Sequence, residues 1–527
     1  MDIKIGYIDT IAIVGYFVVM AVIGYICSRK NKSTEEYFVG GRSFGGWVIG
    51  LSLVGTSISS ISFLAYPADS FKTSWIRYLP NIALPIAVLI ASRTFLKFFR
   101  DKRTTSAYQF LEARFGTSIR IYATMAFIVA ESIRLGIVLY LTSLIVHELT
   151  GLPIDLCIIV AGGFVSIYTI VGGIDAVIWT DVLQTLVLVG GGILCLAMVV
   201  AKVPGGIAEV FRVGLENNKF SFSENINGTL QNLDFFGPLS EKTIFMLILV
   251  GFTTWMTSYS SNQNIIQRYC ATRDLKETKK AMWVCVWSSL PIWAFFMFLG
   301  TALFAFFHHF PTEETQQILA GERKAEQVLP FFIINYLPSG VTGIVIAATL
   351  AAAMSSLDSG INAISTVSVV DIYKRVFVTK KADKHYLKAA WFFASLASVV
   401  MIGGALIISH TDTNTLQDTG LILASVVSGG MLGIYILGFF TKIRGVRSVW
   451  AGIATTLSFT VWTVLSSKDL LPDAISFRYD LYYTTIFGNL IMFFVGFGVY
   501  NIFFKSKSEV LEEDIDSETQ RQEKVYN

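Results

Sequence analysis

Apolar segments long enough to cross a membrane recur along the whole chain and dictate its fold class. Of the 527 residues, 53% are hydrophobic and only 15% are charged, whereas a soluble domain carries about 25% charged residues. Inside lipid the backbone must satisfy its own hydrogen bonds, which a helix does. The sequence therefore predicts an all-α polytopic membrane protein. We expect about 13 transmembrane helices, at residues 6–28, 44–68, 77–99, 117–147, 153–174, 176–202, 241–266, 279–310, 339–371, 385–409, 415–440, 446–466 and 480–504.

Basic residues gather in alternate loops and predict the orientation of the chain. They follow the first, third, seventh, ninth and eleventh spans, as with Lys30, Arg100, Arg268, Lys374 and Arg447. Because loops rich in Lys and Arg stay in the cytoplasm, we expect an external N-terminus and a cytoplasmic C-terminus, in the cell (inner) membrane. The positive charge is spread over short loops, which is not typical of a nucleic-acid-binding protein.

The stretch from Ala351 to Gly360 places hydroxyls and a carboxylate in the middle of a predicted span. Such groups are costly at that depth unless they coordinate something or hold helices together. Oxygen ligands favour an alkali cation, because a transition metal prefers His or Cys. The stretch therefore predicts a cation site. The alternative interpretation is a helix-packing surface of Ala and Ser.

Two spans that lie five apart contain matching polar interruptions, Gly55–Ser62 and Thr253–Asn262. Ser and Thr compete for backbone hydrogen bonds, which favours local unwinding. The pattern predicts two inverted five-helix repeats with broken first and sixth core helices and a binding site between them. The alternative is two Ser/Thr-rich packing faces. The predicted parts are an extra N-terminal transmembrane helix and cytoplasmic loop (1–43), the first repeat (44–202), an external loop (203–240), the second repeat (241–440), two C-terminal helices (441–504) and a charged cytoplasmic tail (505–527).

Four groups of residues carry a resemblance to a known family. They are Tyr37–Arg42, Trp179–Gln184, Asn262–Arg268, and Ser355–Ser359 together with Asp371–Tyr373. In this order, over nearly the whole chain, they resemble the sodium:solute symporter family, in the fold shared with the leucine transporter. The resemblance implies secondary active symport of a small polar organic solute by alternating access. Sodium would be the coupling ion, without a cofactor and without enzymatic activity.

The resemblance also implies a main sodium site between the first and eighth core helices. Backbone carbonyls would come from Gly55, Ile58 and Ala352, and hydroxyls from Ser355 and Ser356. Residues 352, 355 and 356 share one helical face, and carbonyls freed at a helix break can point at a cation.

A second sodium site, found in some relatives, would use Asp181, Ser355, Ser356 and Ser359. This chain departs from those relatives at Asp358, where they often carry a hydroxyl. Asp358 could strengthen the second site, or face elsewhere and pair with a Lys or Arg. The alternative role for Asp181 is to stabilise the N-terminal end of its helix through the helix dipole.

The solute is expected beside the first helix break, with Ser57, Ser59, Ser62 and Asn81 as hydrogen-bonding residues. Arg134 is the remaining candidate, because an Arg in mid-membrane needs a partner and a guanidinium binds a carboxylate through two parallel hydrogen bonds.

Arg134 has two possible roles. It could bind the solute carboxylate, or Glu131, three residues earlier on the same helix, could simply neutralise it.

The Ser-rich break together with Arg134 resembles the bacterial sodium-coupled sialic acid symporters, whose solute joins one carboxylate to many hydroxyls. Asn81 departs from these relatives, which carry Gln, so a neutral sugar, an inositol or a monocarboxylate stays open as the solute. A sodium-independent uniporter and a transporter-like sensor are alternatives of another class. The expected partners are the solute, sodium and the lipid bilayer, and we expect a monomer.

Overall fold

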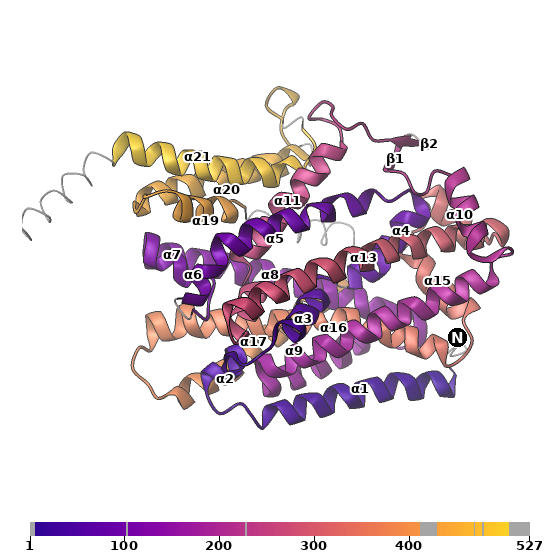
Figure 1. The fold of residues 1–527 in the computed structure, drawn as a ribbon, viewed down its shortest axis with the longest axis horizontal. Coiled ribbons are helices and arrows are strands. Elements are labelled where there is room, and N and C mark those ends of the chain that lie inside the picture. Colours follow the sequence, from indigo (N-terminus) through magenta and orange to yellow (C-terminus); the bar gives the residue numbers. More distant parts are fainter. Residues whose placement is uncertain are drawn as a thin grey trace, which may run out of the picture.

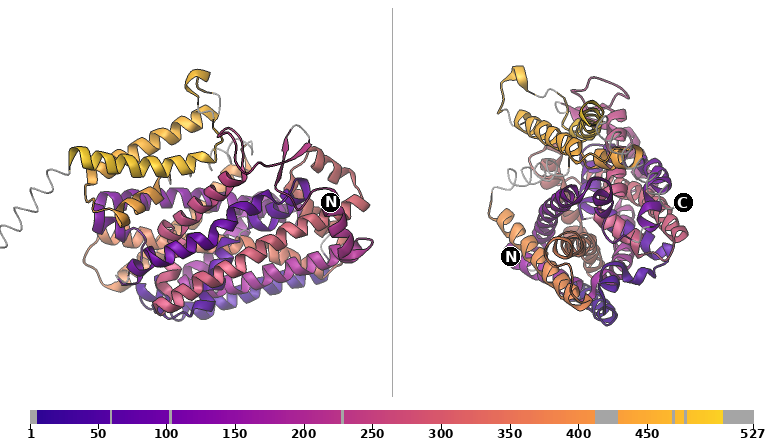
Figure 2. Two further views of the ribbon diagram at one scale, coloured as in Figure 1. Left: turned by 45° about the horizontal axis from the view of Figure 1, so that its top comes forward. Right: turned by 90° about the vertical axis from the view of Figure 1, so that its left-hand side faces the viewer.

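The computed structural model describes residues 6–58, 60–101, 104–226, 229–411, 429–467, 470–476 and 479–504. These residues are almost entirely helical, and the only strands among them form one antiparallel hairpin, β1 (Ser223–Ile226) with β2 (Thr229–Asn232). The helices run along one common direction and form a bundle (Figure 1), which the end-on view in Figure 2 shows as packed circles. The predicted all-α class is confirmed.

Nine helices of the described residues are long and apolar enough to cross a membrane, or up to 10 if a bent pair counts as one span. The pair joins α3 (Gly46–Ser57) to α4 (Ser60–Lys72) with a bend of 54°. The nine are α1 (Tyr7–Ser28), α8 (Thr117–Thr150), α9 (Ile154–Lys202), α11 (Ile244–Ser261), α13 (Leu275–His309), α16 (Val341–Val367, continued by η4, Ser368–Phe377), α17 (Asp383–Ser409), α20 (Val446–Ser467) and α21 (Tyr483–Phe503).

Three departures explain why fewer helices qualify than the sequence predicts. α9 covers two predicted spans in 49 residues, and Gly173 interrupts it with a non-helical backbone (φ 57°, ψ −157°). The predicted span 77–99 is divided into three short segments, 76–83, 84–93 and 95–101. Pro80 lies inside the first, where it cannot donate a backbone hydrogen bond. Most of the predicted span 415–440 lies outside the described residues. The count of about 13 therefore stays a prediction.

Shorter elements connect the long helices. They are α2 (Thr34–Val39), η1 (Gly40–Arg42), η2 (Ile76–Ala83), α5 (Leu84–Arg93), α6 (Phe95–Asp101), α7 (Gln109–Phe115), α10 (Gly206–Glu216), α12 (Gln263–Ala271), α14 (Glu313–Ala320), η3 (Ala325–Gln327), α15 (Val328–Tyr336), α19 (Met431–Phe440) and η5 (Asp473–Ile475). In Figure 1, α2 and α7 lie at one end of the bundle, called here the α2 end, and β1, β2 and α10 lie at the opposite end.

The helix α16 forms the centre of the bundle, packed between α1, α8 and α9. Small residues allow this close packing: a Cβ atom on Gly360 would come within 2.7 Å of Glu131 Oε1 on α8. The first turn of α16 is held by Asp9 of α1, whose Oδ1 accepts hydrogen bonds of 2.7 Å from the backbone N–H groups of both Gly340 and Gly343. The helix with the predicted cation ligands is thus buried and fixed at its start.

Candidate cation and solute sites

The structure brings together the two predicted halves of the main sodium site. α3 ends at Ser57, and Ile58 has an extended backbone (φ −104°, ψ 92°), so the carbonyls of the last helical turn are freed. The Ser355 hydroxyl donates to the carbonyl oxygen of Gly55 at 3.0 Å and to that of Ala352 at 3.2 Å. Gly55, Ala352 and Ser355 therefore meet at the break in the bent pair.

Ser356 adds an oxygen atom for which the protein supplies no partner. Its hydroxyl is completely buried and has no hydrogen-bond partner among the described residues. Buried polar groups are nearly always hydrogen-bonded, so each exception needs an explanation. A ligand beside Ser356 would explain it. Neutral hydroxyl and carbonyl oxygens suit a weakly held monovalent ion, because Ca²⁺ and Mg²⁺ are held with carboxylates.

The carboxylate of Asp181 is held by an arginine that the sequence analysis placed in a basic loop. Arg268, on α12, is only 1% exposed, and one of its terminal nitrogens lies 2.6 Å from Asp181 Oδ2. Its Nε donates to Ser52 Oγ at 2.7 Å, and the same terminal nitrogen donates to Ser359 Oγ at 2.6 Å. The prediction that Arg268 is a charged residue of a cytoplasmic loop is therefore wrong. The Asn262–Arg268 motif, to which it belongs, was the sequence feature that could have indicated a place in the site.

The partners of Asp358 in the structure are hydroxyl groups. Its Oδ2 accepts hydrogen bonds from the Tyr168 hydroxyl at 2.8 Å and from Thr180 Oγ1 at 3.2 Å, and Ser359 donates to its Oδ1 at 3.3 Å. Among the described residues, no Lys or Arg forms an ion pair with it. The alternative of a pairing with Lys or Arg is therefore wrong, and the contribution of Asp358 to a second site stays a prediction. Tyr168 and Thr180, both on α9, were missed.

The buried cluster formed by Asp181, Asp358 and Arg268 has an excess of negative charge when both carboxylates are ionised. All three side chains are 0–1% exposed, and the one guanidinium pairs with Asp181 alone of the described carboxylates. Asp181 Oδ1 has no hydrogen-bond partner among the described residues. Because a buried charge needs compensation, the cluster is suited to one additional monovalent cation.

The predicted solute residues lie on the bent pair and on the segment after it. Ser57 is half-buried at the end of α3, and Ser62 is buried in α4. Asn81, in η2, is buried and donates its side-chain amide to the Tyr66 hydroxyl at 2.7 Å. Ser59 lies outside the described residues. The amide of Asn81 is thus oriented by Tyr66 of α4, the helix that also carries Ser62.

Arg134 forms the pair with Glu131 that the sequence analysis gave as its structural role. Its Nε donates to Glu131 Oε2 at 3.0 Å, and a terminal nitrogen donates to Oε1 at 2.5 Å. Asn264 of α12 also donates to Oε1, at 2.9 Å. The Arg134 side chain is nevertheless 36% exposed, whereas that of Glu131 is 6% exposed. Glu131 therefore fixes the guanidinium of a side chain that is partly accessible as a whole.

Comparisons with known proteins agree with this architecture. The family model of the sodium:solute symporter family matches residues 37–448. The sodium/sialic acid symporter SiaT of Proteus mirabilis is 31% identical over 86% of this chain and 88% of its own length. A Na⁺-coupled sialic acid symporter, solved in a substrate-bound outward-open state with a novel Na⁺ site, superimposes with a TM-score of 0.84 and 28% identity, over 94% of this chain and 98% of that one.

A more distant likeness concerns the fold alone. Mhp1, a nucleobase-cation-symport-1 family transporter, superimposes with a TM-score of 0.54 and 15% identity, over 89% of this chain and 95% of that one. The expected transporter fold and the expected family are both confirmed. The chain belongs to the sodium:solute symporter family.

Proposed function

We propose that this chain imports sialic acid, a carboxylated sugar, together with sodium across the cell (inner) membrane. The observation that carries the sodium coupling is the meeting of Ser355 with the carbonyls of Gly55 and Ala352, beside the unpartnered hydroxyl of Ser356. The choice of solute is supported by the names of the similar symporters and by the partly exposed side chain of Arg134. The family consists of transporters, so we propose no enzymatic activity.

The geometry suggests how sodium and solute are coupled. A sodium ion bound by Gly55, Ile58, Ala352, Ser355 and Ser356 would join the end of α3 to α16, and it would fix the position of the break. Of the proposed solute residues Ser57, Ser59, Ser62 and Asn81, Ser57 ends α3 at the same break. Ser62 lies on α4 after it, and Asn81 is hydrogen-bonded to Tyr66 of α4. An ion that binds best to one arrangement of the break shifts the population toward that arrangement, and thereby shapes the solute pocket.

A second sodium is supported by the charge of the buried cluster. It would lie near Asp181, Asp358 and Ser359, with Ser355 and Ser356 on the same helix completing the predicted ligand set. Arg268 already compensates one of the two carboxylates, at 2.6 Å from Asp181. A single sodium ion would compensate the other.

We also propose that the chain works as a monomer with an external N-terminus and a cytoplasmic C-terminus. The α2 end of the bundle carries Arg42, Arg100, Lys374 and Arg375, in agreement with a cytoplasmic location.

The proposal is tested by uptake of labelled sialic acid into proteoliposomes with and without an inward sodium gradient. Uptake that requires sodium and is blocked by excess unlabelled sialic acid is expected. A panel of neutral hexoses, inositol and monocarboxylates, used as competitors, tests the alternative solutes. Uptake that is equally fast without sodium would identify a uniporter. Uptake inhibited by a neutral sugar but not by unlabelled sialic acid would show that the neutral sugar is the solute.

A further inference from the structure

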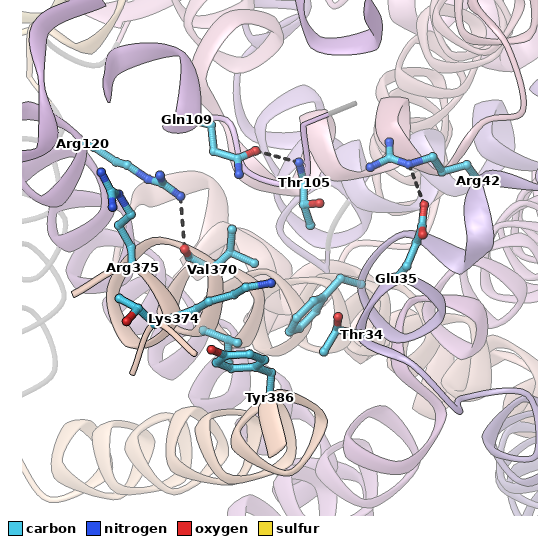
Figure 3. A pocket seen from close by; sticks show the side chains of 13 residues that line it. Thr34, Glu35, Arg42, Thr105, Gln109, Arg120, Val370, Lys374, Arg375 and Tyr386 are labelled. Atoms are coloured by element: carbon cyan, nitrogen blue, oxygen red, sulfur yellow. Dashed lines mark hydrogen bonds and ion pairs between the residues drawn. The ribbon is translucent and has the colours of Figure 1, made fainter. Parts of the chain in front are cut away.

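A cavity of about 570 Å³ opens at the α2 end of the bundle and is separate from the residues assigned above. Its walls come from α2, the segment before α7, α7 itself, α8, η4 and the start of α17, and Figure 3 shows the side chains that face it. The volume lies within the range of small-molecule sites, about 300–1,000 Å³. The cavity is therefore large enough for a sugar-sized solute.

Positive charge dominates this cavity. Four cationic side chains line it, against the single carboxylate of Glu35. They are Arg42, Arg120, Lys374 and Arg375.

Three of the four cations have carboxylate partners. Arg42 lies 3.2 Å from Glu35. Arg120 is held by Asp371, with 2.8 Å between its Nε and Oδ1, and by Glu112, and Arg375 uses that same Glu112 at 2.7 Å. No carboxylate among the described residues forms an ion pair with Lys374, whose amine lies 4.9 Å from the centre of the Tyr386 ring. Lys374 is thus the cation with charge to offer a ligand.

Neutral hydrogen-bonding groups complete the cavity wall. The Gln109 side-chain oxygen accepts from the backbone N–H of Thr105 at 2.9 Å. Its amide nitrogen is therefore left to donate toward the cavity, where Figure 3 places it opposite Lys374. An oxyanion with attached hydroxyl groups would find both a positive charge and hydrogen-bond donors here.

The cavity lies on the two helices that carry the central sites. Arg120 precedes Arg134 on α8 by about four helical turns, roughly 21 Å along the axis, and the two lie within about 40° of the same face. Val370, in the continuation of α16, follows Ser356 by the same distance. A solute released from Arg134 toward the α2 end would move along these helices toward the cavity.

We propose that this cavity is a second, weaker binding site for the carboxylated solute, occupied on the cytoplasmic side during release. The inference rests on the proposed function. Lys374 is the main contact for the carboxylate, with Arg375 beside it, and Gln109 donates to the sugar hydroxyls. Lys374 and Arg375 are both exposed, and exposed charge pairs contribute little binding energy, which suits a site that the solute must leave.

The test measures sodium-dependent transport in inside-out and right-side-out membrane vesicles, which present the two faces separately. Lys374→Gln is expected to raise the half-saturating sialic acid concentration in inside-out vesicles roughly two- to fivefold, and Lys374→Glu is expected to raise it further. In right-side-out vesicles both variants should match wild type, which also shows that they fold. Lys384→Gln and Lys384→Glu, on the exposed face of α17 and outside the cavity, are the matched controls.

The neutral amide of sialic acid separates charge recognition from a general structural effect. Wild type and Lys374→Glu should transport the amide equally well in inside-out vesicles. Three results would each overturn the proposal. They are the same half-saturating concentration of sialic acid in Lys374→Glu and wild type, an increase for the amide as large as that for the acid, and an increase seen only in right-side-out vesicles. A wild type that transports no sialic acid in either vesicle would instead overturn the proposed function, and the ligand assigned to this cavity with it.

Discussion

Replacing Ser356 by Ala should have opposite effects on stability without sodium and on sodium binding. The buried Ser356 hydroxyl has no partner among the described residues. An unsatisfied buried hydroxyl costs about 1–3 kcal/mol, and Ala is a better helix former than Ser. We therefore expect Ser356→Ala to raise the Tm of the purified protein in sodium-free buffer.

The same substitution removes a ligand oxygen when sodium binds. A hydrogen-bond-like contact to a charged group contributes about 1.5–3 kcal/mol, which corresponds to an increase of about 10- to 100-fold in the half-saturating sodium concentration. The increase in Tm on adding sodium, which follows from preferential binding to the folded state, should shrink accordingly. Thermal unfolding over a sodium titration measures both effects in one experiment.

Ser365→Ala is the matched control on the same helix. The Ser365 hydroxyl is also buried, but it donates to the carbonyl of Ala390 at 2.7 Å. Its removal should lower the Tm and leave the sodium dependence unchanged. If Ser356→Ala instead lowered the sodium-free Tm and kept the wild-type sodium affinity, Ser356 would not be a ligand and the argument from its missing partner would fail.

Three further outcomes are expected. Neutralising Asp181 or Asp358 should lower the Hill coefficient for sodium toward one; a wild type that moves a single sodium per solute, by charge-flux measurement, would exclude the second site. Arg134→Lys should weaken solute binding by roughly 1–3 kcal/mol with sodium binding retained, whereas recovery of folding only in a double mutant with Glu131→Gln would indicate a purely structural pair. Burial lowers the pKa of Lys219, outside the spans, from 10.5 to about 7. Because the unfolded chain keeps this proton until about pH 10.5, unfolding free energy should rise with pH between these values, and Lys219→Met should abolish that part of the rise in a denaturant titration.

The sequence could predict the contact between Ser355 and Gly55 because both residues interrupt apolar spans. A polar group in a span is unusual enough to be noticed without knowledge of the fold, and the family resemblance then paired the two interruptions. The fold class followed from the apolar segments in the same way. The boundary within α9 was also predictable, since one helix of 49 residues is about 73 Å long and exceeds a bilayer of about 30 Å.

The partners of Asp358 and the position of Arg268 could not be predicted in this way. Arg268 stands near the end of an apolar segment, and along the sequence it cannot be distinguished from a basic loop residue. Its burial results from α12, which begins after Asn262 and packs against α3 and α16. Tyr168 is equally ordinary in sequence, because Tyr is common in membrane helices and only the packing of α9 on α16 brings its hydroxyl to Asp358.

When both carboxylates of the Asp181–Arg268–Asp358 cluster are ionised, its single uncompensated charge has an electrical consequence. In that state the empty cluster would carry one negative charge within the membrane field, and the cluster with the proposed sodium would carry none. A membrane potential that is negative inside repels the empty site outward, by up to about 2.3 kcal/mol per 100 mV for a charge that crosses the whole field. The resting voltage of the cell would thus reset the empty transporter toward the external face, and it would speed the part of the cycle in which no solute is carried.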